Sequence, residues 1–267
     1  MSSTFLATDG DGYEAQMGRW SRRLAGPFLN FVGRADGECV LDVGCGTGSL
    51  TFALAEQCDV KSAHGIDIAA PYIAHAARRC NDPRLVFQVG DGSSLPFSDR
   101  SFDRTLSLLA LHFMPRPAQA IAEMRRVTKA TGVVAAAVWD IRGGIVASRM
   151  FFDTAAILDP EANIRRARNY TRPMTRPGEL KKAWETAGLY EVVETSLHIR
   201  MDFACFDDYW APYEGRDGPG AEYVACLDAP MRDSIRQAVR LAYLDGEADG
   251  PRSYAATAWA VKGCAGG

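Results

Sequence analysis

Three glycines in five positions, directly after a short apolar run, constrain this chain more than any other feature. The stretch reads VLDVGCGTGSL from Val40 to Leu50, with Gly44, Gly46 and Gly48 at alternate positions. Glycine is costly to order, but it adopts backbone angles that a side chain forbids and lets the main chain approach a ligand closely. A glycine turn between a strand and a helix N-terminus with free N–H groups therefore predicts a nucleotide-like ligand.

Strand and helix patterns alternate along the first half of the chain. We expect short apolar strands at residues 38–44, 62–68, 84–91, 102–111 and 132–140, and helices at 49–58, 70–80 and 116–128. Further on, the patterns predict helical then irregular structure at 145–172, helices at 176–188 and 231–244, and strands at 190–203 and 252–263. Repeating βα units with apolar strands predict an α/β fold with a largely parallel sheet and helices on both faces.

The chain length of 267 residues suits one domain with insertions. We divide it into an N-terminal arm and helix, a central core, two insertions, and the remaining sheet and helix, at residues 1–34, 35–140, 141–175 with 203–250, and 176–202 with 251–263. The N-terminal helix carries an apolar stripe at spacings of three and four: Tyr13, Met17, Trp20, Leu24 and Phe28.

Charge and composition narrow the possible partners. The net charge of -3 and the acidic pI of about 5.9 argue against a nucleic-acid partner. No apolar run approaches the ~18 residues that a membrane span needs, and the N-terminus lacks the features of a signal peptide. The seven cysteines form no CxxC pair, so we expect a reducing, cytoplasmic setting and no metal site.

The spacing of the glycines separates classes of nucleotide site. GxGxG differs by one residue from the dinucleotide pattern GxGxxG and lacks the Gly-Lys-Ser/Thr of a P-loop. Acids follow the next two predicted strands, Asp67 in GIDIAA and Asp91 in GDGSSLPF. A carboxylate at Asp67 could accept both hydrogen bonds of a ribose diol. Asp91 suits the exocyclic amine of adenine, and Gly92 leaves room for a flat ring.

These segments occur in an order that resembles a known family. VLDVGCGTG, GIDIA, GDGSSLPFSDRSFD, LALHFMPRPAQAIAEMRRVTKATG and VVAAAVWD together resemble the class I S-adenosylmethionine-dependent methyltransferases, most closely the UbiE-type (methyltransferase type 11-like) small-molecule branch. The resemblance is close over residues 36–140 and weaker outside them. Where the family often has Pro-Gly-Gly after its fourth helix, this chain has Ala130-Thr131-Gly132. The motifs point to the cofactor and say little about the substrate.

The resemblance implies a Rossmann-like, seven-stranded, mostly parallel sheet whose strand seven is antiparallel, with an N-terminal helical lid and helical insertions. It implies S-adenosylmethionine as the methyl donor and S-adenosylhomocysteine as its product. The cofactor-binding residues that it implies are Tyr13, Trp20, Asp42, Gly44, Cys45, Gly46, Asp67, Ile68, Asp91, Gly92 and Leu108. The glycine loop would wrap the methionine part, Asp42 would order that loop, Ile68 would pack on the adenine, and the Leu108 carbonyl would accept from the ammonium group.

The acceptor side has candidates but no motif. His112 follows the fourth predicted strand, where it either deprotonates a substrate hydroxyl or only shapes the site. We expect Trp139, Trp210 and Tyr213 to line the substrate. Ordinary core packing is the alternative for these aromatic residues, and also for Tyr13 and Trp20.

The resulting functional hypothesis is in-line methyl transfer from S-adenosylmethionine to an O, N or C atom of a small molecule. No Asn/Asp-Pro-Pro-Tyr motif follows the fourth predicted strand, which argues against nucleic-acid bases and amides as acceptors. We expect a monomer or homodimer without a membrane span. The alternative is a non-catalytic S-adenosylmethionine-binding regulatory or partner module. A third hypothesis, an NAD-dependent enzyme, is disfavoured by the GxGxG spacing.

Overall fold

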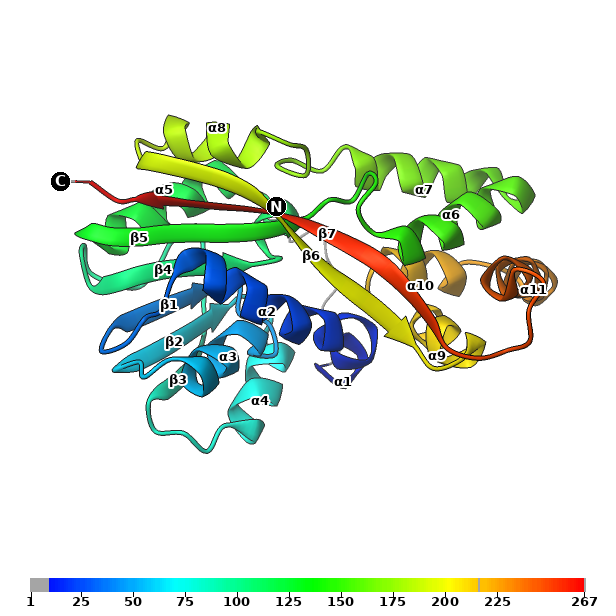
Figure 1. Cartoon of the computed structure of the whole chain (residues 1–267), viewed down its shortest axis with the longest axis horizontal. Coiled ribbons are helices and arrows are strands. Elements are labelled where there is room, and N and C mark those ends of the chain that lie inside the picture. The colour runs from blue at the N-terminus through cyan, green and yellow to red at the C-terminus, as the bar shows by residue number, and fades with distance from the viewer. Residues whose placement is uncertain (1–9, 216, 267) are drawn as a thin grey trace.

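The computed structural model describes residues 10–215 and 217–266, and these contain one seven-stranded sheet (Figure 1). Its strands are β1 (Cys39–Val43), β2 (Ser62–Asp67), β3 (Leu85–Val89), β4 (Phe102–Leu108), β5 (Thr128–Trp139), β6 (Tyr190–Phe203) and β7 (Arg252–Cys264). The strand order is β3-β2-β1-β4-β5-β7-β6, and β7 runs antiparallel to both of its neighbours. The expected Rossmann-like sheet with an antiparallel strand seven is confirmed.

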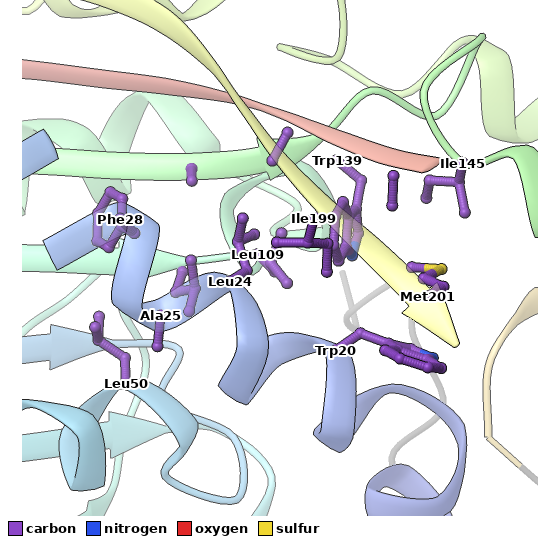
Figure 2. Close-up of a cluster of buried hydrophobic side chains, with 14 of the residues drawn as sticks. Trp20, Leu24, Ala25, Phe28, Leu50, Leu109, Trp139, Ile145, Ile199 and Met201 are labelled. Atoms are coloured by element: carbon purple, nitrogen blue, oxygen red, sulfur yellow. The ribbon is translucent and has the colours of Figure 1, made fainter. Parts of the chain in front are cut away.

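Helices cover both faces of the sheet. The helices that follow or flank the first strands are α2 (Arg19–Val32), α3 (Ser49–Gln57), α4 (Ala70–Arg79), α5 (Pro117–Val127) and α8 (Glu179–Thr186). One hydrophobic cluster joins α2 and α3 to the sheet, and a second joins α5 and α8 to it. Figure 2 shows the first cluster, where side chains of α2 gather with Leu50 of α3, Trp139 of β5 and Ile199 of β6.

The glycine loop lies where the direction of strand succession reverses. From β1 the chain adds β2 and β3 on one side, and then crosses to add β4 and β5 on the other. In open α/β sheets, ligands bind at such a switch point, beyond the carboxyl ends of the strands. The fold therefore puts the loop after β1 and the segment after β4 at the edge where a ligand is expected.

The N-terminal helical segment contains an irregular turn. It runs as α1 (Gly10–Tyr13), a π-helical turn η1 (Glu14–Gly18) and then α2, so the predicted helix is present with a widened turn inside it. The apolar stripe packs inward as expected, with Leu24 and Phe28 fully buried (Figure 2). Single π-turns inside helices often occur at functional sites.

The two insertions form a group of helices beyond the carboxyl ends of the parallel strands (Figure 1). They are α6 (Val146–Leu158), α7 (Pro160–Tyr170), α9 (Phe206–Trp210), a 3-10 turn η3 (Ala211–Glu214), α10 (Pro219–Ala225) and α11 (Ala229–Leu244). The sequence did not predict α10, because its Pro-Gly start reads as a turn. Within the described residues, no helix combines the length and the apolar content needed to cross a bilayer.

Two predicted boundaries were wrong. The fourth strand ends at Leu108 and is followed by a 3-10 turn η2 (Leu111–Phe113), because Leu109 has a positive φ of 64° that interrupts the strand. The fifth strand begins at Thr128 and not at residue 132 as expected, so Ala130, Thr131 and Gly132 lie inside β5.

Candidate functional site

Main-chain hydrogen bonds to β2 fix the loop between β1 and α3. The amide of Gly44 donates to the Ile66 carbonyl at 2.8 Å, and the amide of Cys45 donates to the same oxygen at 3.1 Å. Gly44 has a φ of +75°, and a Cβ there would clash with that of Ala110. Gly46 has a φ of +55°, and no described protein atom lies within 4 Å of a Cβ built on it. The fold itself requires the first glycine, whereas the second borders open space.

Asp67, the last residue of β2, ties this loop to the next helix. Its Oδ2 accepts from the Gly46 amide at 2.9 Å, and its Oδ1 accepts from the Ala69 amide at 2.8 Å. Burial raises the pKa of Asp67, while these backbone bonds lower it. Each carboxylate oxygen keeps a further lone pair that a diol could use. Next to it, Ile68 is 60% exposed, which fits an apolar surface that a flat ring could cover.

Asp42 is buried at the end of β1 and is only partly satisfied. Its Oδ2 accepts from the Thr51 hydroxyl of α3 at 2.7 Å, which links the two elements on either side of the loop. Its Oδ1 is buried without a hydrogen-bond partner among the described residues, as are the hydroxyls of Ser49 and Ser107 near the same strand ends. Burial raises the pKa of Asp42 to about 7. Such orphaned atoms are rare in native proteins, and a ligand with polar groups would satisfy them.

Asp91 and Gly92 lie after β3, at the same edge of the sheet. Asp91 accepts from the Ser93 amide at 2.7 Å, and its other oxygen accepts from Arg116 at 2.9 Å. A Cβ at Gly92 would come within 2.8 Å of Val43 Cγ1. Gly92 therefore also serves close packing against β1, beyond the role expected from the sequence.

The N-terminal segment brings Tyr13 to the loop but not Trp20. Burial, opposed by a hydrogen bond with Ser21 at 3.2 Å, raises the pKa of Tyr13 to about 12, with smaller contributions from the charges of Glu14, Asp67 and Asp42. Glu14 accepts a hydrogen bond from the hydroxyl of Thr47 inside the loop. Trp20 instead packs edge-on against Phe203 of β6, with ring centroids 5.3 Å apart. The structure thus supports the core-packing alternative for Trp20.

His112 follows β4, and Trp139 is the last residue of the neighbouring strand β5. The Leu109 amide joins the two segments by donating to the Ala137 carbonyl at 2.7 Å. His112 is 2% exposed, and both of its ring nitrogens are buried without a partner in the described part of the chain. The indole nitrogen of Trp139 is likewise buried without a hydrogen-bond partner among the described residues. Burial, with a smaller contribution from the Arg172 charge, lowers the pKa of His112 to about 3.

Trp210 and Tyr213 belong to the aromatic core of the insertions. Trp210 is 1% exposed, stacks on Phe206 and donates its indole N–H to Glu214 at 2.7 Å. The ring of Tyr213 stacks on Phe151 with centroids 3.9 Å apart. These contacts agree with the packing alternative for both residues.

The surroundings of Cys45 do not favour a reactive thiolate, and the described residues do not form a metal site. Burial raises the pKa of the Cys45 thiol well above its usual range, which favours a main-chain role for this residue. Among residues 10–215 and 217–266, no three His, Cys, Asp or Glu side chains gather as a metal ion would require.

Three residues that the sequence did not single out belong to the site: Glu14, Thr51 and Arg172. Glu14 and Thr51 hold the loop through tertiary hydrogen bonds, and Arg172 lies near His112. Thr51 lies in the first turn of the helix that follows the glycine loop, so its hydrogen bond to Asp42 could have been predicted from the sequence. Glu14 and Arg172 are brought in by long-range packing that leaves no local signal.

Comparison with known proteins gives matches to the same region. Residues 41–136 match a family model described as a methyltransferase domain. The chain is 37% identical over 120 residues to a demethylmenaquinone methyltransferase of Renibacterium salmoninarum, covering 44% of this chain and 46% of that protein. It is 31% identical over 129 residues to a 27-O-demethylrifamycin SV methyltransferase of Amycolatopsis mediterranei, covering 47% of each. The chain spans about half the length of the curated relatives it matches.

A solved structure extends the likeness to the whole fold. It is a phosphoethanolamine N-methyltransferase of Haemonchus contortus in complex with phosphomonomethylethanolamine and S-adenosylhomocysteine. The match has a TM-score of 0.60 at 14% identity, over 96% of this chain and 56% of that one. The ordered motifs, the sheet with its antiparallel seventh strand and the matched residues 41–136 lead to one conclusion: the chain carries a methyltransferase domain of the class I S-adenosylmethionine-dependent kind and is similar there to UbiE-type relatives.

Proposed function

We propose that this chain is an enzyme that transfers the methyl group of S-adenosylmethionine to an O, N or C atom of a small-molecule acceptor. One arrangement carries the proposal: at the switch point, Asp67 holds the Gly46 amide while Asp42 keeps a buried carboxylate oxygen without a described partner. The two curated relatives are named for small demethylated acceptors, a menaquinone and a rifamycin, which supports an acceptor of that size.

We assign the cofactor-binding roles residue by residue. The main chain of the loop from Gly44 to Gly46 and the Asp42 carboxylate would hold the methionine part, and Asp67 would hold the ribose. Ile68 and Asp91, with Gly92 beside it, would meet the adenine, the Leu108 carbonyl would accept from the ammonium group, and Tyr13 would cover the site. S-adenosylmethionine supplies an electrophilic methyl group on a sulfonium. The protein then has to orient the acceptor and exclude water, and orientation can supply roughly 7–11 kcal/mol.

We propose a single domain in which residues 35–140 bind the cofactor and the insertions at 141–175 and 203–250 face the acceptor. Ion pairs support this unity, since Arg19 of α2 lies 2.8 Å from Asp208 of α9. We further propose a cytoplasmic monomer or homodimer that does not act on nucleic acid. All seven cysteines are free, which is consistent with a reducing compartment.

His112 is better suited to hydrogen bonding than to proton abstraction. A pKa near 3 means that the imidazole holds a proton weakly, and Arg172 opposes an imidazolium in particular. A general base works best when its pKa lies near the working pH. We therefore propose His112 as a neutral group that contacts the acceptor, and Trp139 as a second polar contact on the same side.

The direct test supplies methyl-labelled S-adenosylmethionine and small-molecule extracts from several organisms to the protein. The proposal expects a labelled low-molecular-mass product that disappears with the Asp67→Ala variant. Binding of S-adenosylhomocysteine without any labelled product would favour the non-catalytic module. A thermal shift with NAD but with neither S-adenosyl compound would overturn both.

A further inference from the structure

The carboxylate of Glu14 connects the N-terminal segment to the glycine loop. Glu14 begins the π-helical turn η1, and its side chain is only 16% exposed. The carboxylate accepts from the hydroxyl of Thr47 in the loop and from Arg22 of α2, and Arg79 of α4 lies 3.8 Å from it. Hydrogen bonds to an ionised group are roughly twice as strong as those between neutral groups. The contact with Thr47 is therefore a strong one between two distant parts of the chain.

Gly18 makes room for this carboxylate. It is the last residue of η1 and has a φ of -55°, which any residue adopts, so the backbone angle does not require glycine there. A Cβ built on Gly18 would lie 2.5 Å from Glu14 Cδ and 2.6 Å and 2.7 Å from the two carboxylate oxygens. The Glu14 side chain thus folds back over the π-turn, and the missing side chain at Gly18 allows it to do so.

Thr47 stands between the two glycines that give the loop its unusual backbone. Gly46 and Gly48 both have a positive φ, whereas Thr47 is 1% exposed and is held by its side chain. The Gly48 amide donates to the Cys45 carbonyl at 2.9 Å, so the turn closes around Thr47. Fixing the Thr47 hydroxyl therefore restrains the main chain on both sides of it, next to the open space beside Gly46.

We propose that Glu14 is a positioning residue for the methyl donor: it holds Thr47 so that the main chain from Gly46 to Gly48 already has the conformation that receives S-adenosylmethionine. The proposal rests on the proposed function and adds a residue that lies outside the matched residues 41–136 and acts through Thr47. A loop that is ordered before binding loses less conformational entropy when the ligand arrives, so the contact should raise the affinity for the cofactor.

Other contacts hold the N-terminal segment without Glu14. The ring centroid of Tyr13 lies 5.1 Å from that of Tyr72 in α4, and Arg19 at the start of α2 lies 2.8 Å from Asp208 of α9. Loss of the Glu14 contact should therefore leave the segment in place and loosen only the loop. This separates a positioning role of Glu14 from a general role in folding.

The first test displaces the carboxylate without removing it. Gly18→Ala puts a methyl group where the Glu14 carboxyl group lies, at a helical position where alanine is intrinsically better than glycine. We expect a roughly 5- to 50-fold weaker affinity for S-adenosylhomocysteine by calorimetry, from the lost charge-assisted hydrogen bond. Urea titrations should show that the variant is folded. Unchanged affinity in the folded Gly18→Ala variant would overturn the proposal.

A pair of substitutions tests whether Glu14 acts through Thr47. Glu14→Ala and Thr47→Val should each weaken the binding of S-adenosylhomocysteine, and the double variant should bind no more weakly than the weaker single variant. Thr47→Ser keeps the hydroxyl and should recover most of the affinity. Additive losses in the double variant, or a Thr47→Ser variant that binds as weakly as Thr47→Val, would overturn the action through Thr47.

The control removes a carboxylate of the same kind from an exposed position. Glu56→Ala, in α3, should leave the affinity for S-adenosylhomocysteine unchanged. A loss equal to that of Glu14→Ala would overturn a specific role of Glu14. Failure of the unsubstituted protein to bind S-adenosylhomocysteine would instead overturn the proposed function on which the positioning role rests.

Discussion

The cofactor side and the acceptor side of this site hold their polar groups in different ways. On the cofactor side, main-chain amides and strand-end acids are joined by short-range bonds, as between Asp67 and the Gly46 amide. On the proposed acceptor side, His112, Trp139 and Arg172 belong to three separate segments, and Arg172 lies over the ring of Phe113, the neighbour of His112. The first arrangement is local and can be carried by a motif. The second depends on how the inserted helices pack, so it can vary without disturbing the donor site.

The largest expected effect comes from the packing of the acceptor side. Trp210→Ala removes a fully buried ring and should lower the free energy of unfolding by about 3–5 kcal/mol in urea titrations. Affinity for S-adenosylhomocysteine should change little in the folded protein, because Trp210 belongs to the other region. Leu241→Ala, at an exposed position of α11, is the matched control and should cost less than about 0.5 kcal/mol. A large loss of cofactor affinity with Trp210→Ala would contradict the statement that Trp210 lies outside the cofactor site.

Substitution of two glycines of one loop should affect different properties: mainly stability at Gly44, and cofactor affinity at Gly46. Gly44→Ala forces a side chain into a positive φ and against Ala110, and should lower the free energy of unfolding by about 2–4 kcal/mol. Gly46→Ala meets no described protein atom and should cost about 1–2 kcal/mol from its backbone angle alone. Its methyl group should instead weaken cofactor binding. Equal losses of stability, with unchanged affinity for Gly46→Ala, would contradict this assignment of the space beside the loop.

An isosteric replacement of Asp67 tests the cofactor site while keeping the volume of the side chain. Asp67→Asn keeps the shape but replaces one of the two carboxylate oxygens, each of which accepts from a main-chain N–H, with an amide NH2 that cannot accept. We expect a roughly 10- to 100-fold loss of affinity for S-adenosylhomocysteine by calorimetry, from lost charge-assisted hydrogen bonds. Asp36→Asn, at an exposed acid on the far side of β1, serves as the control. An unchanged affinity for the Asp67 variant would remove it from the ribose site.

The smallest effect is a pH dependence that originates at Asp42. Its pKa is about 7 in the fold and 3.8 as a free side chain, so between these values the folded state holds a proton that the unfolded state has lost. Stability must then fall as pH rises through this window, by about 1 kcal/mol between pH 5.5 and 6.5. Asp42→Asn should flatten that slope in urea titrations at the two pH values. A slope equal to that of the unsubstituted protein would show that another group is responsible.

The same contrast explains what could be predicted from the sequence. Motif spacing and strand ends were enough to single out Gly44, Asp42 and Asp67 as candidates, and the family resemblance implied the seven-stranded sheet with its antiparallel strand seven. Trp20 and Trp210 pack against other aromatic rings in the core. The sequence left this open, because an aromatic stripe does not say which neighbour each ring meets in three dimensions. The end of β4 was misplaced because Leu109 has a positive φ, which an apolar run in the sequence does not reveal.

Arg172 marks the limit of such reasoning. It lies in an arginine-rich stretch without a motif, and a long-range contact of the segment after α7 puts it over Phe113. Glu14 is similar, since its hydrogen bond to Thr47 depends on how the N-terminal segment crosses the loop. Local patterns do not encode the contacts of residues of this kind.

The most direct test of the donor site is a calorimetric titration of the protein with S-adenosylhomocysteine and, separately, with NAD. We expect one site for S-adenosylhomocysteine with a Kd in the micromolar range, about -8 kcal/mol, no measurable heat with NAD, and severe weakening with Asp67→Ala. Binding of NAD in place of S-adenosylhomocysteine, or equal affinity in the Asp67→Ala variant, would contradict the assignment of this loop to the methyl donor.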